Sequence, residues 1–457
     1  MIVTRKGFSQ VVANSFAGFG FPPEAPWVME FPLEMFLPGS DLSPLEKNID
    51  RVVYGLTRWE PQTYKVKGIV SPPKVTVEGK DYEDAVAKMN FLFLRNLWSD
   101  GLPIQPPTKE RVNWILKGTD LPRETVIGKI LPRGGIATME MLAVSLAMSG
   151  GRPEYLPILI AAVEAMTKPD YQHEAMNATT CSVYPAIVVN GPVTRQIRLN
   201  SGYGCLGPDP VHPAGASIGR ALRFILMNVG GAIPGSGTMA IYGGPARYTN
   251  IVFAEDEGGM APGWKPLNEE RGFPKGSNTV TVMDVGGTAN INIVAKSEAP
   301  MEKSILNTLE GYAGYMRIPS KNSLYAMSLE DGTGGLLLVP RGVVKELSQL
   351  GWSKEKVQQY LWEKSKIPDT PQLRWEIQNR VKTGETPKEL EQYPFPITRK
   401  PSGIYIVVAG GEQSGHSYWM QAGHGGYVAK TTGVKLPAAW EDLLKKAEDD
   451  LGPAPSR

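Results

Sequence analysis

The chain has 457 residues, too long for one ordinary domain, so we expect two or three domains with apolar cores. Its 48 Lys and Arg residues nearly balance 46 Asp and Glu residues, and a net charge of +2 does not indicate a nucleic-acid-binding surface. Apolar stretches such as residues 156–163 are too short to span a membrane, and the first residues do not resemble a secretory signal. Two cysteines cannot form a disulfide framework. We therefore expect a cytoplasmic protein with neither a membrane nor nucleic acid as partner.

The N-terminal stretch predicts a strand at residues 2–4, a helix at 7–19 and a second strand at 27–31. A single strand–helix–strand unit cannot bury both faces of its sheet. We therefore expect either later strands or another polypeptide to cover it.

The next part of the chain predicts a strand at 74–77 and a helix from Asp81 to about Trp98. Residues 100–108 contain three prolines and predict a rigid turn, after which Thr108 is a candidate N-cap. Two helices that are apolar around most of their circumference follow, at 139–148 with Thr138 as N-cap and at 153–166. Such helices are typical of a buried core.

Four later apolar runs predict buried strands, and each ends in Gly, Pro or a polar side chain: 186–190, 249–257, 335–340 and 404–412. Helical patterns lie between or beside them: 217–228, 301–316, 341–350 and 353–365. This alternation predicts an α/β fold with mixed or largely parallel sheets covered by helices, in two or three subdomains. Ligands in such folds bind beyond the carboxyl ends of the strands, which nominates Asn190, Glu255 with the adjoining Asp256 and Glu257, and Glu412.

Both cysteines flank the run at 186–190, with His212 close behind the second of them. Cys181 and Cys205 are each either a buried, inert side chain or a nucleophilic or redox thiol, which would need a nearby base or positive dipole. The spacing is not that of a C-x-x-C redox pair, so the thiols would have to meet through the fold. Cys205 lies among glycines that allow close approach of a ligand, and it is the better candidate.

Several side chains near this run are candidates for holding a substrate. Asn190 is either a turn residue or a ligand contact, and Arg195 and Arg198 could hold a carboxylate or phosphate. A helix beginning near Ser217 presents free N–H groups to an anion, and Arg220 could orient the substrate. Neither a G-x-G-x-x-G motif after a strand nor a Walker A motif occurs, which disfavours a standard nucleotide fold.

Two polar segments offer proton transfer or metal binding. The Glu255 segment is either a solvated loop, a cation site or an acid–base pair. The Gly-rich segment 410–427 contains Glu412, His416 and His424, which could exchange protons or bind a divalent metal, although their spacing matches no zinc signature.

Five segments together resemble a poorly characterised bacterial family linked to the UGSC-type (seleno)proteins: residues 100–108 (DGLPIQPPT), 153–158 (PEYLPI), 190–192 (NGP), 215–221 (GASIGRA) and 406–411 (IVVAGG). The resemblance covers the chain from about Lys74 onward. The first sixty or so residues resemble the closing part of the UGSC module, in which a selenocysteine or cysteine lies in an upstream U/C-Gly-Ser-Cys motif. This chain lacks that motif, so the motif is either missing or carried by a separate subunit, and the strand-first N-terminus favours the separate subunit.

These observations predict an N-terminal segment (1–73) like the end of a UGSC module, a central α/β domain (74–300) with both cysteines, and a C-terminal α/β domain (301–457) with the Gly/His-rich loop. The leading hypothesis is an oligomeric small-molecule enzyme for thiol- or selenol-assisted addition, elimination or reduction, acting with a small Cys- or Sec-bearing partner. A second hypothesis is a self-sufficient hydrolase or lyase that uses a cysteine or a bound metal. A third is a non-catalytic binding or scaffold subunit.

Overall fold

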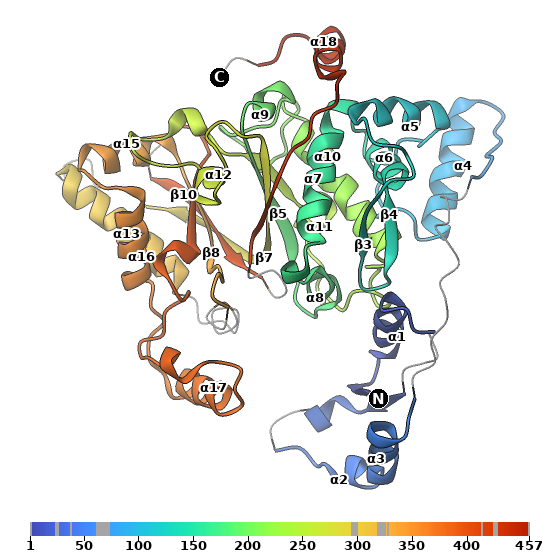
Figure 1. The fold of residues 1–457 in the computed structure, drawn as a ribbon, viewed down its shortest axis with the longest axis vertical. Helices are drawn as coiled ribbons and strands as arrows, with labels where there is room; N and C mark the ends of the chain where they lie inside the picture. Colours follow the sequence, from blue (N-terminus) through green and yellow to red (C-terminus); the bar gives the residue numbers. More distant parts are fainter. Residues whose placement is uncertain are drawn as a thin grey trace.

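A computed structural model describes residues 2–22, 27–36, 39–60, 74–293, 300–317, 326, 329–412, 415–423 and 428–455. Figure 1 shows a central body, built of a curled sheet with helices around it, from which the N-terminal residues and helix α17 (Pro371–Lys382) project at the same end. The predicted α/β class with a mixed sheet is confirmed.

The described residues form eleven strands in three sheets. The strands are β1 (Ile2–Arg5), β2 (Val28–Phe31), β3 (Val126–Ile130), β4 (Gly135–Thr138), β5 (Tyr184–Asn190), β6 (Ile251–Ala254), β7 (Thr279–Asn292), β8 (Gly335–Val339), β9 (Ile404–Val408), β10 (His416–Ala422) and β11 (Lys430–Gly433). The main sheet has the order β6-β5-β7-β10-β8-β9, with β11 also paired to β7. The pairs β1–β2 and β3–β4 are separate.

The main sheet contains the same three-strand pattern twice. In the first half, β5 and β6 are parallel, and β7 lies antiparallel on the other side of β5. In the second half, β8 and β9 are parallel, and β10 lies antiparallel on the other side of β8. The two halves join through the antiparallel pair of β7 and β10. The sheet is therefore an internal duplication of one topology, which no short sequence repeat reveals.

The sheet curls until the carboxyl ends of its two edge strands, β6 and β9, meet. The backbone N–H of Asp256 donates to the carbonyl of Val408 at 2.7 Å, and the N–H of Gly410 donates to the carbonyl of Ser201 at 2.9 Å. Arg341 holds the Asp256 carboxylate with two hydrogen bonds, one of which is 2.8 Å long. Loops from both halves are thus fixed against each other at this corner.

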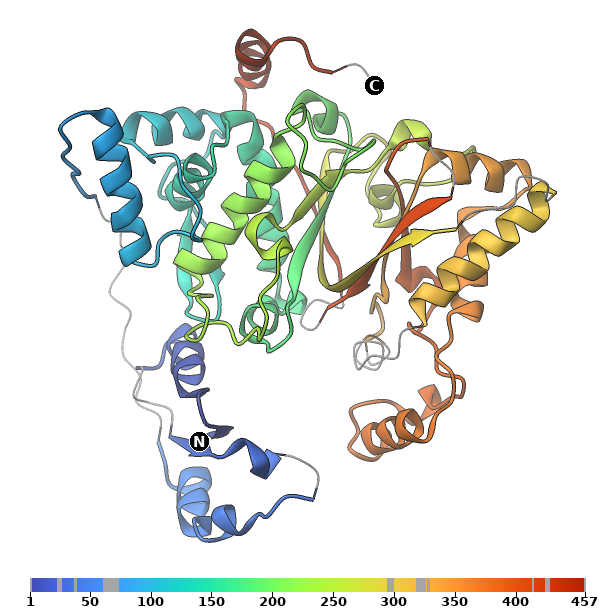
Figure 2. The same cartoon turned by 180° about the vertical axis from the view of Figure 1, so that it is seen from behind.

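The described helices either cover the outer face of the two halves or lie at the periphery of the body and project from it (Figures 1 and 2). They are α1 (Ser9–Gly18), α2 (Ser43–Glu46), α3 (Ile49–Thr57), α4 (Tyr82–Arg95), α5 (Lys109–Ile115), α6 (Met139–Met148), α7 (Leu156–Met166), α8 (His173–Ala178), α9 (Val193–Gln196), α10 (Ala214–Phe224), α11 (Ala246–Thr249), α12 (Leu267–Glu270), α13 (Met301–Met316), α15 (Arg341–Gln349), α16 (Lys354–Lys364), α17 (Pro371–Lys382) and α18 (Trp440–Leu451).

The alternation of side chains along each strand divides the core into three parts. Ile187, Val189 and Val282 face a core shared with α5, α6, α7 and α10. Leu337 and Ile406 face a second core shared with α13, α15 and α16. The side chains that alternate with these along the strands point to the inner face of the curled sheet, where those of both halves pack together into a third core. All seven residues of β5 are buried, as expected for a strand with both faces covered.

Most predicted elements are confirmed, and their caps explain where they begin. The side-chain oxygens of Thr108 and Thr138 accept hydrogen bonds from backbone N–H groups three residues later, at 3.3 and 3.4 Å. One predicted strand is wrong: residues 74–77 form no strand and pair with no described strand. The helix expected at 217–228 is present, but it begins three residues earlier, at Ala214, and ends as a π-helical turn. The predicted 300/301 boundary lies within the span of one sheet, since both predicted domains contribute strands to it.

The N-terminal residues form a small parallel pair, β1 and β2, that joins no other described strand. The few buried side chains in this part of the chain include Thr4, Val11, Met29 and Phe31. Helix α1 contacts the body at the β3–β4 turn, where the backbone of Gly18 lies against Pro132 and Gly134. The side-chain amide of Asn14 also donates to the carbonyl of Ser236, which lies in the loop after the π-helical turn. A two-stranded parallel sheet buries little apolar surface by itself.

Candidate functional site

The carboxyl ends of β5 and β6 carry a pair of buried polar side chains. Asn190 is the last residue of β5, and Glu255 directly follows β6; they are 0 and 1% exposed. The Asn190 side-chain amide donates to Glu255 Oε2 at 2.7 Å. The backbone N–H of Glu255 still pairs with the carbonyl of Val189 at 3.0 Å, so the sheet itself positions the carboxyl group. The strand-end rule thus located a real polar pair.

The turn after β5 brings a second carboxylate to this pair. Gly191 has φ of +92°, and a Cβ there would lie 2.5 Å from the side-chain oxygen of Asn278, so only glycine fits. Its backbone N–H donates to Glu257 Oε1 at 2.6 Å, and the Asn190 amide donates to the same oxygen at 3.2 Å. Two donors therefore hold the Glu257 carboxylate beside Glu255.

Glu255 has one oxygen bound and one oxygen free. Oε2 also accepts from the backbone N–H of Leu267 at 2.7 Å. Oε1 is buried without a hydrogen-bond partner among the described residues, as is the side-chain oxygen of Asn190. Burial raises the pKa of Glu255 to about 7, against the opposing effects of Lys354, Asn190 and Leu267. A carboxyl group with such a pKa exists in both protonation states near neutrality, as a general acid–base catalyst requires.

A buried lysine from the second half of the chain lies behind this carboxyl. Lys354, the first residue of α16, is 1% exposed. Its ammonium group donates to Glu270 Oε2 and to the carbonyl of Lys265, both at 2.8 Å. Burial raises the pKa of Glu270, against the effect of this lysine. The positive charge of Lys354 therefore stabilises the carboxylate forms of both Glu255 and Glu270.

A cavity of about 570 Å³ adjoins Glu255. This volume lies in the range of small-molecule sites. Its walls come from the turn after β5, the loop after β6, the approach to β7 and the C-terminal tail, with these residues: Gly191, Pro192, Thr194, Arg195, Gln196, Glu255, Glu257, Gly276 and Ala454. A smaller cavity of about 290 Å³ follows under α18 and shares Gln196 and Ala454.

The two cysteines lie at opposite ends of β5. Cys181 is exposed and precedes the strand, whereas Cys205 is buried on the inner face near its carboxyl end. Seven strand residues span roughly 23 Å, so the thiols do not form a pair. Burial raises the pKa of Cys205 to about 12, which leaves it almost entirely as an unreactive thiol. The preference for Cys205 as the reactive thiol is therefore not supported.

His212 belongs to a local network close to the same corner. Its Nδ1 lies 2.6 Å from Asp209 Oδ2, which also accepts from the side-chain amide of Asn200 at 2.7 Å. The network orders the glycine-rich loop that contains Cys205. None of its side chains lines the cavity beside Glu255.

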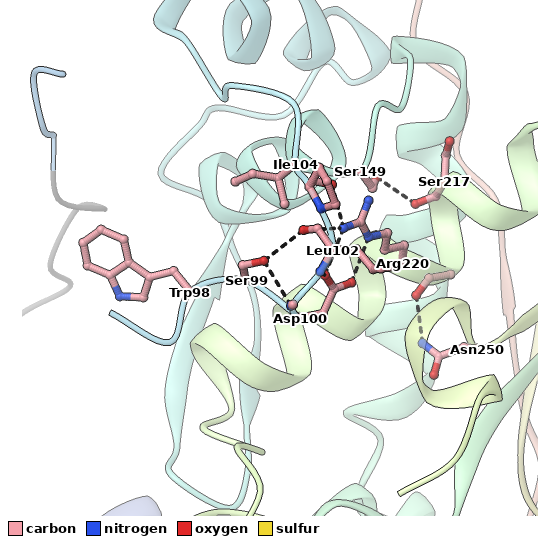
Figure 3. Close-up of polar contacts among 12 residues, drawn as sticks. Trp98, Ser99, Asp100, Leu102, Ile104, Ser149, Ser217, Arg220 and Asn250 are labelled. Carbon is pink, nitrogen blue, oxygen red and sulfur yellow. Dashed lines mark hydrogen bonds and ion pairs between the residues drawn. The ribbon is translucent and has the colours of Figure 1, made fainter. Parts of the chain in front are cut away.

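Arg220 and Ser217 lie away from the cavity, on the face of α10 shown in Figure 3. The Arg220 guanidinium holds the Asp100 carboxylate with two hydrogen bonds of 2.8 and 2.9 Å and also donates to the carbonyls of Leu102 and Pro103. The backbone carbonyl of Ser217 accepts from the Ser149 hydroxyl at 2.9 Å. These contacts fix the 100–108 turn to α10, so Arg220 has a structural partner where a substrate contact was expected.

The Gly/His-rich segment is only partly a loop. His416 begins β10, where it is exposed and pairs with Asn292 across the sheet. Glu412 is 77% exposed and lies 3.7 Å from Arg341. His424 falls outside the described residues. Within the described part of the chain, no group of three or more His, Cys, Asp or Glu side chains is arranged to hold a metal ion.

A second buried polar cluster lies at the other end of the sheet, and no pattern in the sequence predicted it. The Tyr171 hydroxyl donates to Asp284 on β7. Burial raises the pKa of Asp284 to about 7, while Tyr171, Arg247 and Arg223 oppose that rise. Burial lowers the pKa of Arg223 to about 9. The cluster lies under α7, α10 and α11 and adjoins neither cavity described above.

The comparisons with known proteins found no matching family model, no matching curated protein and no matching solved structure. Among the described helices, none combines the length and the apolar character needed to cross a membrane.

Proposed function

We propose that the chain is a small-molecule enzyme whose active site is the cavity at the carboxyl ends of β5 and β6, with Glu255 as general acid and base. One observation carries the proposal: a fully buried carboxyl borders the cavity, has a free oxygen and has a pKa raised to about 7. Perturbed carboxyl groups of this kind are concentrated at catalytic sites.

The surrounding groups suit addition and elimination chemistry. As a base, Glu255 would take a proton from a carbon next to an electron-withdrawing group, and the C–H electron pair would form the double bond as the leaving group departs. The Leu267 N–H and the Lys354 charge stabilise the carboxylate form of Glu255, and its burial stabilises the acid form. In the reverse direction Glu255 would return the proton.

Hydrogen exchange tests this role without knowledge of the full reaction. The protein is incubated near neutral pD in D₂O with a panel of small amino, hydroxy and unsaturated carboxylic acids, and ¹H NMR follows the loss of C–H signals. The wild type should exchange a proton next to the carboxylate of at least one compound, and Glu255→Gln should slow that exchange by about 100-fold or more. Glu412→Gln, which changes an exposed carboxylate, is the matched control and should exchange at the wild-type rate. Undiminished exchange in Glu255→Gln, or no exchange across the panel, would contradict the proposal.

The second part of the proposal is a small Cys- or Sec-bearing partner docked on the N-terminal segment. It is supported by the isolated β1–β2 pair and by the large apolar side chains exposed around it: Phe19, Leu33, Phe36, Leu42, Ile49, Val53, Tyr54 and Leu56. The buried Cys205 and the remote Cys181 also favour a thiol from another polypeptide. Mass spectrometry of the complex purified from its native cells should find a subunit with a C-G-S-C or U-G-S-C motif. A monodisperse, fully active chain alone would contradict this part.

The acid–base role of Glu255 and the docking of a partner concern different ends of the molecule. The N-terminal segment projects from one end of the body, whereas α9 and α12, which flank the Glu255 cavity, lie at the other end (Figure 1). A partner on β1 and β2 would therefore approach the Cys181 end of β5 first. The acid–base role of Glu255 does not depend on it.

A further inference from the structure

We infer that the cavity beside Glu255 takes a small zwitterion, a molecule with a carboxylate at one end and a protonated nitrogen at the other, such as an amino acid. The inference rests on the proposed function, because it names the substrate class of the same cavity. It follows from the charged groups of the cavity wall, which are Arg195, Glu257 and the buried carboxyl of Glu255.

Arg195 is the cation of this wall. It lies on α9, directly after the turn that carries Gly191, and its side chain is exposed. Among the described residues it forms neither a side-chain hydrogen bond nor an ion pair, so its guanidinium is available to a ligand. A guanidinium group binds a carboxylate through two parallel N–H donors, which makes it a specific receptor for that group.

Glu257 is the complementary anion. Its Oε1 is occupied by the backbone N–H of Gly191 and the Asn190 amide. Its Oε2 has no partner among the described residues and is the position where an ammonium group would bind. The two donors on Oε1 fix the carboxylate, so little conformational entropy is lost when a cation binds.

The cation and the anions of the cavity wall are not paired with each other. Within the described chain, no ion pair of 4.0 Å or less joins Arg195 to Glu257 or to Glu255, although all three line one cavity. The other wall residues are small or uncharged: Gly191, Pro192, Thr194, Gln196, Gly276 and Ala454. One cation and one fixed anion match a zwitterion, whereas a phosphate group would be met by a single cation and two carboxyl groups.

Glu255 lies where proton transfer to such a ligand is useful. Its N–H pairs with Val189 and its Oε2 is occupied, which leaves Oε1 as the free atom. A carboxylate on Arg195 and an ammonium on Glu257 would place the ligand in the cavity that Glu255 borders. The ammonium group, and the pairing of the carboxylate with the Arg195 cation, would both make the neighbouring C–H proton more acidic.

Binding experiments on the full-length protein test the inference. The probes are glycine, L-alanine, β-alanine and 4-aminobutyrate, each compared by calorimetry with the analogue that lacks the amine (such as propionate) and the analogue that lacks the carboxylate (such as ethylamine). At least one zwitterion should bind 10-fold more tightly than both of its analogues. Arg195→Ala and Glu257→Gln should each weaken that binding by 10-fold or more, and Arg195→Lys should restore part of it. Arg95→Ala, which changes an exposed arginine on α4, and Glu412→Gln should bind as the wild type does.

The outcomes separate this inference from the proposed function. Equal binding of zwitterions and analogues, preference for inorganic phosphate, or binding that is unchanged in Arg195→Ala would overturn the inference, even if Glu255→Gln abolishes hydrogen exchange. Zwitterion binding that depends on Arg195 and Glu257, together with normal exchange in Glu255→Gln, would support the inference and overturn the acid–base role.

Discussion

Replacing Glu255 with Gln should stabilise the protein at alkaline pH and change its stability little at acid pH. Burial raises the pKa of this carboxyl from the ordinary 4.5 to about 7. Because the pKa is higher in the folded than in the unfolded state, the contribution of Glu255 to the free energy of unfolding is complete below pH 4.5 and is lost as the pH rises to 7. At 1.36 kcal/mol per unit, the loss is about 3 kcal/mol.

The variant removes this pH dependence because an amide does not titrate. The introduced side-chain carbonyl oxygen can accept the hydrogen bond that the Leu267 N–H now donates to Glu255. The free energy of unfolding of Glu255→Gln, minus that of the wild type, should therefore increase by about 3 kcal/mol between pH 4.5 and pH 8.

Urea unfolding followed by tryptophan fluorescence at the two pH values measures this difference. Subtraction of the wild type cancels the contributions of other titrating groups, including Asp284, whose pKa is also raised to about 7. Glu412→Gln is the control, because it makes the same chemical change at an exposed carboxylate. A Glu255→Gln difference that is the same at pH 4.5 and pH 8, or that decreases, would refute the electrostatic account of the site.

Three further predictions concern residues away from the cavity. Arg220→Ala should lower the free energy of unfolding by about 3 kcal/mol in urea titrations, because it removes the cation that pairs with the buried Asp100 carboxylate. Ligand binding should not change, and a loss of binding in a folded variant would support the predicted substrate role of Arg220. Cys181 should react with iodoacetamide in the folded protein and Cys205 only after unfolding, as peptide mass spectrometry can show; reaction of both in the native state would contradict the burial argument. Arg198→Ala should free the C-terminal tail, whose carbonyls this buried side chain holds, and speed its removal by carboxypeptidase; an unchanged rate would mean that α18 alone anchors the tail.

The sequence predicted the elements whose signals are local. The caps Thr108 and Thr138 and the apolar helices α6 and α7 lie where the pattern placed them. The long strand β7 was missed, because its second half, residues 284–292, contains Asp, Asn and two glycines. Those residues adopt the strand conformation through pairing with β10, which is more than 120 residues away in the chain. No local pattern reports such a pairing.

The residues of the candidate site also fall into those that the sequence predicted and those that it did not. Asn190, Glu255 and Glu257 follow from the rule that ligands bind at strand carboxyl ends. Lys354 could not be identified, because it lies in the ordinary charged sequence KEKVQQ and becomes buried only when α16 packs against the loop after β6. Arg341 likewise acquires its role through contact with Asp256 from the other half of the sheet. Residues that complete a site from a distant element carry no signal of their own.

The internal duplication allows the polar site of the first half to be compared with the equivalent position in the second half. Val189 pairs with Ala254 in the first half as Val339 pairs with Val408 in the second, so Glu255 corresponds to Ala409. The backbone agrees: the N–H of Glu255 donates to Val189 at 3.0 Å and that of Ala409 to Val339 at 3.1 Å.

In the second half, Pro340 and Ala409 thus occupy the places of Asn190 and Glu255, and neither can hold or move a proton. The second half contributes instead the supporting charges, Arg341 and Lys354. The backbone geometry at the strand ends is therefore common to both halves, whereas the Glu255 carboxyl and the Asn190 amide occur only in the first half. This difference indicates that the polar pair is not needed to build the corner, and it strengthens the case that Asn190 and Glu255 serve chemistry.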